Sequence, residues 1–282
     1  MTFSLSPAGG GPQDFATADG TVRRADPGAA PFPVVWITGA SSGIGRELAL
    51  RLARAGSVVA ASARSTDALD RLVLDAEGLP GRIVAYPLDV ADGDAVVAAG
   101  RKIVSALGTP DLCVLNAGIH ASAAGGDFTA GQVMRLFDVN VFGTVRVLEA
   151  VIPGMIARRA GRIAVVASVA GYRGLRSAAA YGASKAALIN MCEALRVELA
   201  DFGVTVQLVN PGFVDTPMTK VNDFPMPFLM TVERAAEQFH RGLLTDRFEI
   251  TFPKRFTWAM KALRLLPYAV YLPLMGWATR RR

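Results

Sequence analysis

The chain has 282 residues, of which 51% are hydrophobic and 19% charged, a balance typical of a globular protein with a large buried core. Its formal net charge of +6 is unevenly distributed: seven bases and no acid follow Glu249, so the rest of the chain is close to neutral. A neutral body lacks the broad basic face of a nucleic-acid-binding protein, and we expect no nucleic-acid partner.

Residues 1–32 are rich in Gly, Pro, Ala and Ser without an apolar period, which predicts a disordered arm. No basic segment followed by an apolar run marks a signal peptide, and no uninterrupted apolar stretch approaches the roughly 20 residues of a membrane-spanning helix. Cys113 and Cys192 lie in apolar stretches, which indicates buried thiols in a reducing compartment. We therefore expect a cytoplasmic protein, and we predict no metal site.

From Pro33 onward, short apolar runs alternate with longer helical patterns. Strands are predicted at 34–38, 57–63, 82–88, 112–116, 162–167, 204–209 and 248–251, and helices at 43–55, 66–77, 92–107, 131–159, 178–201 and 232–244. Apolar strands that alternate with helices favour one parallel sheet covered on both faces. We therefore predict a single α/β domain over residues 33–252, a Rossmann-type doubly wound sheet, followed by a helical tail at 253–282.

The first predicted strand ends in the turn Thr38-Gly39-Ala40-Ser41-Ser42-Gly43-Ile44-Gly45, and a helix begins there. In a dinucleotide-binding turn, Gly39 permits the tight bend, Gly43 lets a pyrophosphate approach the backbone, and Gly45 allows close packing of helix on strand. The helix N-terminus supplies free amides and partial positive charge to the phosphates. A plain tight turn is the alternative interpretation.

The second predicted strand ends in Ala63-Arg64-Ser65, at the position where an acid would bind the 2′-hydroxyl of NAD. Arg64 instead suits the 2′-phosphate of NADP, with which it can form charge-assisted hydrogen bonds. We therefore predict that NADP(H) is preferred over NAD(H). A solvated surface arginine is the alternative.

Tyr181 and Lys185 lie four residues apart in a run of helical composition, which places a phenol and an ammonium on one helix face. A free tyrosine has a pKa of about 10, and a nearby cation favours the phenolate. The pair is a candidate acid/base catalyst near neutral pH, although such a spacing also arises by chance.

These motifs occur in the order found in the classical short-chain dehydrogenase/reductase family, which the chain resembles over about residues 33–252. Asp89-Val90, Asn116-Ala117-Gly118 and Pro211-Gly212 with Thr216 match further family motifs after the third, fourth and sixth strands. The family's catalytic tetrad is matched by Asn140, Ser168, Tyr181 and Lys185. One departure is Leu115, where many members have asparagine.

The resemblance implies an oxidoreductase in which Tyr181 donates a proton to a substrate carbonyl, or accepts one in reverse. Lys185 would lower the tyrosine pKa and bind the nicotinamide ribose, and Ser168 would hydrogen-bond the substrate oxygen. Asn140 would hold a water on a proton path, and Thr216 would bind the carboxamide. The implied cofactor-binding residues are Gly39, Ser41, Ser42, Gly43, Ile44, Gly45, Arg64, Asp89, Val90, Asn116, Ala117, Gly118, Tyr181, Lys185, Pro211, Gly212, Val214 and Thr216.

The segment 217–230 carries three Met and two Phe among few charges. Such side chains suit an adaptable apolar pocket, so we predict a lipophilic ketone or secondary alcohol, such as a steroid, fatty-acyl or terpenoid carbonyl. Packing of the segment onto the body is the alternative. The candidate pocket residues are His120, Tyr172, Leu175, Phe213, Met218 and Phe224, and His120 is also a candidate for an extra catalytic group.

Residues 253–282 extend beyond the family's common core. Apolar residues recur there at helical spacing, and the uncharged run 265–277 contains two prolines that we expect to break it. Basic flanks with Trp and Tyr suit a segment lying in a membrane interface, whereas packing on the body or on a neighbouring subunit is the alternative. The resemblance implies a homodimer or homotetramer formed through the two long helices.

Other functions stay open. The chain could be a dinucleotide-binding sensor without chemistry, an NAD-dependent dehydrogenase of a small alcohol, or a membrane-surface interaction protein that acts through its tail.

Overall fold

Residues 15–16, 22–23, 30–121, 128–220 and 226–279 are described by the structure, a computed structural model. Seven parallel strands form one sheet in the order β5-β4-β3-β6-β7-β8-β9. These strands are β3 (Val34–Thr38), β4 (Val58–Ala63), β5 (Arg82–Pro87), β6 (Leu112–Leu115), β7 (Gly161–Val166), β8 (Val204–Pro211) and β9 (Glu249–Phe252). The predicted doubly wound parallel sheet is confirmed.

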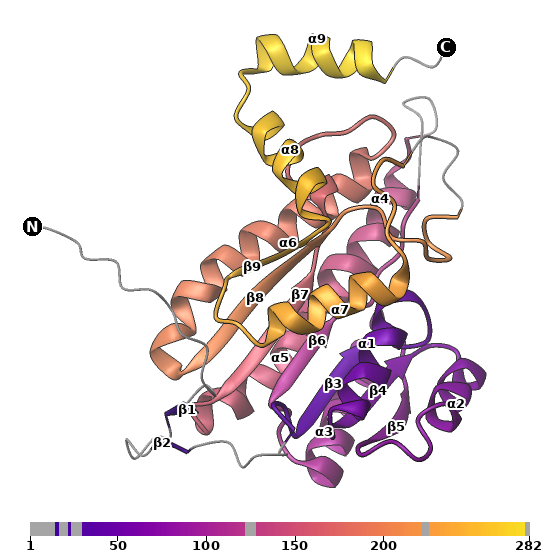
Figure 1. Cartoon of the computed structure of the whole chain (residues 1–282), viewed down its shortest axis with the longest axis vertical. Helices are drawn as coiled ribbons and strands as arrows, with labels where there is room; N and C mark the ends of the chain where they lie inside the picture. The colour runs from indigo at the N-terminus through magenta and orange to yellow at the C-terminus, as the bar shows by residue number, and fades with distance from the viewer. Residues whose placement is uncertain (1–14, 17–21, 24–29, 122–127, 221–225, 280–282) are drawn as a thin grey trace, which may run out of the picture.

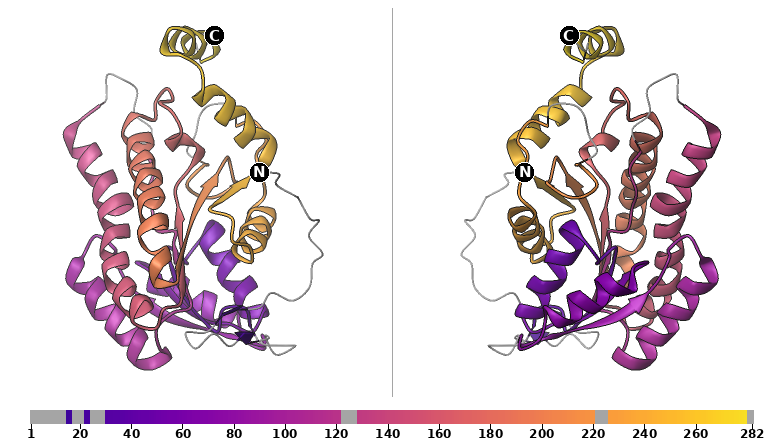
Figure 2. Two further views of the ribbon diagram at one scale, coloured as in Figure 1. Left: turned by 90° about the vertical axis from the view of Figure 1, so that its left-hand side faces the viewer. Right: turned by 90° about the vertical axis from the view of Figure 1, so that its right-hand side faces the viewer.

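Helices cover both faces of this sheet (Figures 1 and 2). One face is covered by α1 (Gly43–Arg54), α2 (Thr66–Leu74) and α7 (Val232–Leu243), and the other by α3 (Gly93–Leu107), α5 (Gly143–Ala157) and α6 (Ala179–Glu198). Because side chains alternate along a strand, Val35 and Ile37 of β3 belong to one core cluster and Trp36 to the other. The two clusters hold the three layers together.

Both cysteines are free and buried, as predicted. Cys113 and Cys192 belong to the core cluster on the α3, α5 and α6 face. Burial, together with the charge of Glu193, raises the pKa of the Cys192 thiol to about 12. Both thiols therefore act as small apolar core residues.

The long helix predicted at 131–159 is divided. It consists of α4 (Ala130–Phe137), a wider π-helical turn (Asp138–Phe142) and α5. By length and composition alone, the stretch Ala130–Ala157 could cross a membrane. Its apolar side chains Val147, Val151 and Met155 pack into the core, however, which accounts for its composition.

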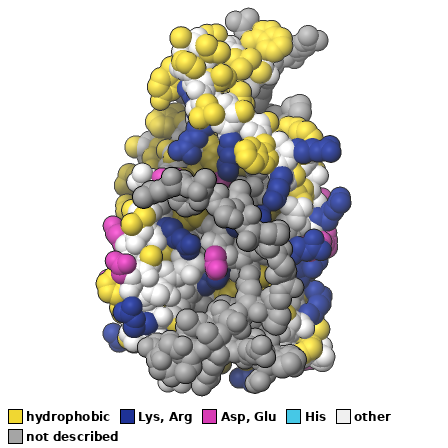
Figure 3. All heavy atoms as spheres, turned by 60° about the vertical axis from the view of Figure 1, so that its left-hand side comes forward, with side chains coloured by type: hydrophobic (Ala, Val, Ile, Leu, Met, Phe, Trp, Pro, Cys, Tyr) yellow, Lys and Arg dark blue, Asp and Glu magenta, His cyan; other side chains and the backbone are white. Residues whose placement is uncertain are grey.

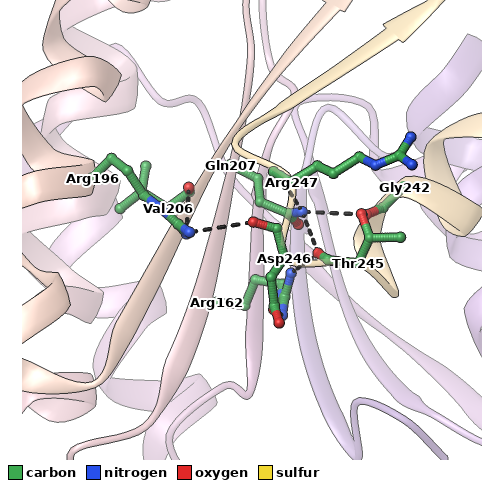
Figure 4. A network of polar contacts seen from close by, with 8 residues as sticks. All are labelled: Arg162, Arg196, Val206, Gln207, Gly242, Thr245, Asp246 and Arg247. Carbon is green, nitrogen blue, oxygen red and sulfur yellow. Dashed lines mark hydrogen bonds and ion pairs between the residues drawn. The ribbon is translucent and has the colours of Figure 1, made fainter. Parts of the chain in front are cut away.

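A buried polar network fixes the loop between α7 and β9 (Figure 4). Gln207 of β8 donates through Nε2 to the carbonyl oxygens of Thr245 and Arg247, at 2.8 and 2.9 Å. Arg162 of β7 donates to the same Thr245 oxygen at 2.6 Å and forms an ion pair with Asp246 at 2.9 Å. These bonds satisfy carbonyl groups that would otherwise be costly to bury, and they attach the edge strand β9 to the sheet.

Most of the predicted arm at residues 1–32 lies outside the described residues. Within it, β1 (Phe15–Ala16) and β2 (Val22–Arg23) pair in antiparallel fashion. Phe32, which we assigned to the arm, is instead buried, with the Arg162 guanidinium 5.9 Å from its ring centroid. The folded body therefore includes Phe32.

The tail forms two helices, α8 (Lys254–Arg264) and α9 (Tyr268–Ala278), beyond the carboxyl edge of the sheet (Figure 1). Met260 of α8 is buried in the core cluster that contains α6. The prolines do not break α9 as we expected, since Pro267 precedes its first turn and Pro273 lies within it. A proline is tolerated at a helix start, where no amide hydrogen bond is lost.

Candidate active site

The strand order reverses between β3 and β6, and a cavity of about 300 Å³ lies at the carboxyl ends of these strands. Asn116 donates through Nδ2 to the carbonyl oxygens of Thr38 and Gly39, at 3.2 and 3.0 Å. The Thr38 hydroxyl in turn accepts from the backbone amides of Asn116 and Ala117, both at 3.2 Å. These bonds hold two loops against one cavity, at the position where ligands bind in doubly wound sheets.

Two glycines permit this close approach. Gly39 has a φ of +68°, and a Cβ atom there would lie 2.8 Å from the Ala117 Cα atom. A Cβ atom at Gly45 would lie 2.4 Å from the Gly39 carbonyl oxygen. A larger residue at either position would force the first helix and the loop after β6 away from the turn. The geometry supports the roles that we predicted for both glycines.

The first turn of α1 is arranged for an anion. Its N-cap residue, Ser42, makes no side-chain capping bond, and no acidic residue lies in the first turn. The N-termini of α2, α3, α4 and α7 are capped by Ser65, Asp92, Thr129 and Thr231, whereas α6, α8 and α9 also lack a side-chain cap. The start of α1 lies on the cavity wall through Ser42, Gly43 and Ile44. Uncapped helix amides bind phosphate groups, so the residues present fit the pyrophosphate of a dinucleotide.

Most of the predicted site residues line this one cavity. They are Gly39, Ser41, Ser42, Gly43, Ile44, Arg64, Asp89, Val90, Asn116, Ala117, Gly118, Ser168, Tyr181, Lys185, Pro211, Gly212, Val214, Thr216 and Met218. Residues that the prediction missed also line it: Ser62, Ala63, Leu88, Ile119, Val139, Val166, Ala167, Pro217 and Thr219. Nearly all of these missed residues adjoin a motif residue in the sequence, which was the available signal.

Arg64 lies exposed at the end of β4, on the wall of the cavity. Among the residues that the structure describes, no acidic side chain forms an ion pair with it. Its planar guanidinium is therefore available to bind a phosphate through two parallel hydrogen bonds.

Three of the predicted catalytic side chains meet on the cavity wall. Ser168 follows β7, and its Oγ atom accepts from the Ala170 amide at 3.1 Å. Lys185 of α6 is buried, and its ammonium donates to the Val166 carbonyl at 2.8 Å. The same Nζ atom lies 5.8 Å from the centroid of the Tyr181 ring. The end of β7 and one face of α6 therefore bring a hydroxyl, a phenol and an ammonium together.

Burial shifts the pKa of both α6 groups. It raises the pKa of the Tyr181 phenol, and a hydrogen bond with Ser168 opposes the rise. Burial also lowers the pKa of Lys185 to about 8. We expected Lys185 to lower the tyrosine pKa. In this structure burial has the larger effect and raises the pKa of Tyr181. The Lys185 ammonium donates to the Val166 carbonyl.

Asn140, in the π-helical turn, is buried beside the cavity. Its Oδ1 atom accepts from the Ile119 amide at 2.8 Å, and its Nδ2 atom donates to the Ile119 carbonyl and to Ser184 Oγ, at 3.0 and 3.1 Å. We expected Asn140 to hold a water. That role stays a prediction. The side-chain amide fixes the loop after β6 against α6, which is a positioning role.

Two of the candidate substrate residues lie at the catalytic end of the cavity. His120 packs edge-on against Tyr181, with ring centroids 4.6 Å apart and an interplanar angle of 87°. Met218 lies on the cavity wall. His120 therefore contributes surface next to the phenol, where a substrate oxygen would bind.

The other candidates lie elsewhere. Tyr172 is buried, and its hydroxyl donates to Glu249 in a second cavity of about 560 Å³, so its assignment to the substrate pocket is corrected. Leu175 packs against the core, and the Phe213 ring lies 5.4 Å from that of Phe256. Phe224 lies outside the described residues.

The family model described as short chain dehydrogenase matches residues 33–224. The chain belongs to the short-chain dehydrogenase/reductase family. The chain is 39% identical over 245 residues to an uncharacterized oxidoreductase of Myxococcus xanthus, covering 87% of this chain and 95% of that one. It is 40% identical over 187 residues to a 3-oxoacyl-[acyl-carrier-protein] reductase of Thermotoga maritima, covering 66% and 76%. It is also 40% identical over 215 residues to human 17-beta-hydroxysteroid dehydrogenase type 1, covering 74% and 64%.

Solved structures agree with this assignment. A short-chain dehydrogenase from Streptomyces avermitilis superposes on the present chain with a TM-score of 0.74 at 29% identity, covering 87% of this chain and 96% of that one. A 3-oxoacyl-[acyl-carrier protein] reductase from Brucella melitensis with bound NAD has a TM-score of 0.68 at 29% identity, covering 78% and 88%. An alcohol dehydrogenase from Thermococcus sibiricus, complexed with 5-hydroxy-NADP, has a TM-score of 0.71 at 25% identity, covering 78% and 95%. The protein is therefore an NAD(P)-dependent oxidoreductase.

Proposed function

We propose that this protein transfers a hydride between NADP(H) and the carbonyl or secondary alcohol of a lipophilic molecule. The observation that carries the proposal is the position of Tyr181, Ser168 and Lys185 on the wall of the cavity that also holds the uncapped start of α1. An acid/base group and a phosphate-binding turn in one cavity are what hydride transfer with proton transfer requires.

The side chains have complementary roles. When bound, the nicotinamide supplies the hydride in reduction and accepts it in oxidation. Because the pKa of Tyr181 is raised, its phenol is protonated at neutral pH and can give its proton to the substrate oxygen. Ser168 donates a hydrogen bond to the same oxygen. Lys185, with a pKa of about 8, is mainly charged at neutral pH and stabilises the phenolate that remains.

The preference for NADP(H) rests on Arg64. The guanidinium is exposed on the cavity wall at the end of β4, where the adenosine ribose binds in doubly wound folds. The relatives with solved structures include one with bound NAD and one with 5-hydroxy-NADP. The choice between NAD and NADP for the present chain therefore rests on Arg64.

The lipophilic substrate class rests on the segment after β8. Pro217 and Met218 of this segment line the cavity, and Phe213 and Phe228 at its ends pack beside Phe256 of α8. An apolar cover of this kind favours an apolar substrate. The names of two relatives, a 3-oxoacyl-[acyl-carrier-protein] reductase and a hydroxysteroid dehydrogenase, point to the same class.

We test the proposal with a panel of steroid, acyl-thioester, terpenoid and small polar carbonyls, following NADPH absorbance. We expect turnover of lipophilic members. The Tyr181→Phe variant should bind NADPH as the unmodified protein does and lose about a thousandfold in turnover. Activity confined to small polar sugars would contradict the substrate class. Cofactor binding without turnover of any panel member would instead indicate a dinucleotide sensor.

We also infer that copies of the chain pair through the long helices. Three apolar side chains are exposed there: Phe142 at the end of the π-helical turn, Val145 in the first turn of α5, and Val197 near the end of α6. Light scattering on the Val197→Glu variant tests this pairing, because a buried charge would separate the copies. A mass equal to that of one chain for the unmodified protein would refute it.

A further inference from the structure

Helix α9 is apolar on nearly every side and little of it is covered by protein. Tyr271 is its buried residue, whereas Tyr268, Leu272 and Trp277 are exposed to 73, 61 and 74%. Successive residues are about 100° apart around a helix, so Tyr268 and Leu272, four residues apart, share one face. Trp277 and Val270, which is 51% exposed, lie on the opposite side, so the exposed apolar residues do not form one stripe. A helix that docks in a protein groove has one apolar stripe, whereas a helix that is hydrophobic all round is typical of apolar surroundings.

The length of α9 limits how it can contact lipid. Its 11 residues span about 16 Å, roughly half of the hydrocarbon thickness of a bilayer, so it is too short to cross one. Tyr268 and Trp277 near its two ends, and Trp258 of α8, are of the kind that concentrates at membrane–water interfaces. These features favour a helix that lies in the interface plane.

The charges around α9 indicate which lipid surface would bind. Lys254, Arg255 and Arg264 of α8 are exposed, and no acid follows Glu249 in the sequence. In Figure 3, apolar side chains cover one end of the molecule, and Lys and Arg side chains lie directly below them. An apolar helix bordered by bases is complementary to a surface with apolar chains and negative headgroups.

We propose that α8 and α9 dock the protein on an anionic phospholipid bilayer. Helix α9 lies in the interface, and the bases of α8 contact the headgroups. The docking is independent of the hydride-transfer chemistry, since none of these residues lines the cofactor cavity.

The docking segment is rigidly attached next to the active site. The guanidinium of Arg173 lies 4.8 and 3.9 Å from the ring centroids of Tyr268 and Tyr271, and it donates to the Leu263 carbonyl at 2.9 Å. The Tyr271 hydroxyl donates to the Gly174 carbonyl at 2.7 Å. Arg173 and Gly174 belong to the loop that follows Ser168. Docking would therefore turn the carboxyl edge of the sheet, where the cavity lies, toward the bilayer (Figure 1).

The full-length protein is sedimented with vesicles of phosphatidylcholine alone and of phosphatidylcholine with phosphatidylserine. We expect binding to the anionic vesicles that weakens at high salt, and little binding to the neutral ones. Leu272→Ser should weaken binding about tenfold, because an interfacial leucine is lost. Leu74→Ser on α2 is a matched control, since Leu74 is also 61% exposed.

A second pair of matched variants tests the contribution of the basic side chains. Arg264→Glu on α8 should weaken binding to the anionic vesicles about tenfold, whereas Lys102→Glu, an exposed site on α3, should leave it unchanged. Equal binding to both vesicle types, or equal effects of the matched variants, overturns the proposal. So does α9-dependent self-association without vesicle binding, which would identify a second copy as the occupant. The Tyr181→Phe variant should bind vesicles normally, which separates docking from the proposed activity.

Discussion

Asn140 holds the backbone of Ile119 at both of its polar groups. Its Oδ1 atom accepts from the Ile119 amide at 2.8 Å, and its Nδ2 atom donates to the Ile119 carbonyl at 3.0 Å. Ile119 lines the cavity directly after Gly118. The wide π-helical turn at Asp138–Phe142 carries the asparagine that makes this clamp, so a local irregularity of the helix is tied to the shape of the cofactor cavity.

Replacing Asn140 by alanine should therefore affect both stability and cofactor affinity. The amide and carbonyl of Ile119 would lose their partners, which costs about 1–3 kcal/mol for each buried group left without one. We expect a loss of about 2–4 kcal/mol in unfolding free energy in urea and weaker NADPH binding in a fluorescence titration. Asn140→Asp, which keeps the acceptor and loses the donor, should fall in between. Normal stability and affinity in the alanine variant would show that the clamp is dispensable.

Cofactor choice should depend on Arg64. In Arg64→Asp a carboxylate would repel the 2′-phosphate of NADP and suit the 2′-hydroxyl of NAD. We expect kcat/KM for NADPH to fall about a hundredfold, the loss of a charge-assisted contact, and kcat/KM for NADH to rise. Arg71→Asp, on the exposed face of α2, is the control and should change neither value. A tenfold preference of the unmodified protein for NADH would refute the assignment.

Lys185 should give the protein a stability that rises with pH. Its folded pKa of about 8 lies below the usual value of 10.5, so between these values the unfolded chain binds more protons than the folded one. The cost of burying the ammonium is fully present below pH 8 and is relieved as pH rises toward 10.5, by about 3 kcal/mol.

Urea unfolding at a series of pH values checks this expectation. Lys185→Met should remove the rise between pH 8 and 10.5, while other titrating groups cancel in the comparison with the unmodified protein. Lys102→Met, at an exposed position of α3, should retain the rise. Parallel curves for the Lys185 variant and the unmodified protein would show that the ammonium is not buried.

Glu249 should stabilise the attachment of α8 to the sheet. Its carboxylate accepts from Tyr172, Asn210 and Lys261. Burial acts to raise the pKa of Glu249, but the hydrogen bonds from these three groups outweigh it, and the pKa is lowered. The stabilisation is therefore complete above the unfolded pKa of about 4.3 and is lost as pH falls through the lower folded value.

Glu249→Gln should lower the unfolding free energy at neutral pH by about 2 kcal/mol, because hydrogen bonds to a charged group are weakened. Glu237→Gln breaks an exposed ion pair with Arg241 on α7 and should cost less than about 0.5 kcal/mol. Thermal unfolding of both variants at pH 7 and pH 4 makes the comparison. Equal losses of unfolding free energy in the two variants at pH 7 would show that the Glu249 network stabilises the protein no more than an exposed ion pair does.

The regular part of the fold follows from local patterns. Runs such as Val34–Thr38 and Val204–Pro211 are long and apolar, so both their strand character and their place in a parallel sheet can be read without knowing their neighbours. The wider turn at Asp138–Phe142 has no comparable signal. It forms because Asn140 bonds to Ile119, 21 residues earlier, and to Ser184, 44 residues later.

The sequence by itself determined the chemistry of the site: a glycine turn before a helix, an arginine at a strand end, and a tyrosine and a lysine one turn apart. These signals are local, because spacing along a strand or helix decides which groups share an edge or a face. Only the tertiary structure decided that the Tyr172 hydroxyl donates to Glu249 and that Lys185 donates to the Val166 carbonyl. It also decided that α9 remains largely uncovered by protein. Each of these depends on which distant segments pack together, and side-chain burial, which sets pKa values and exposed apolar surface, is a property of that packing.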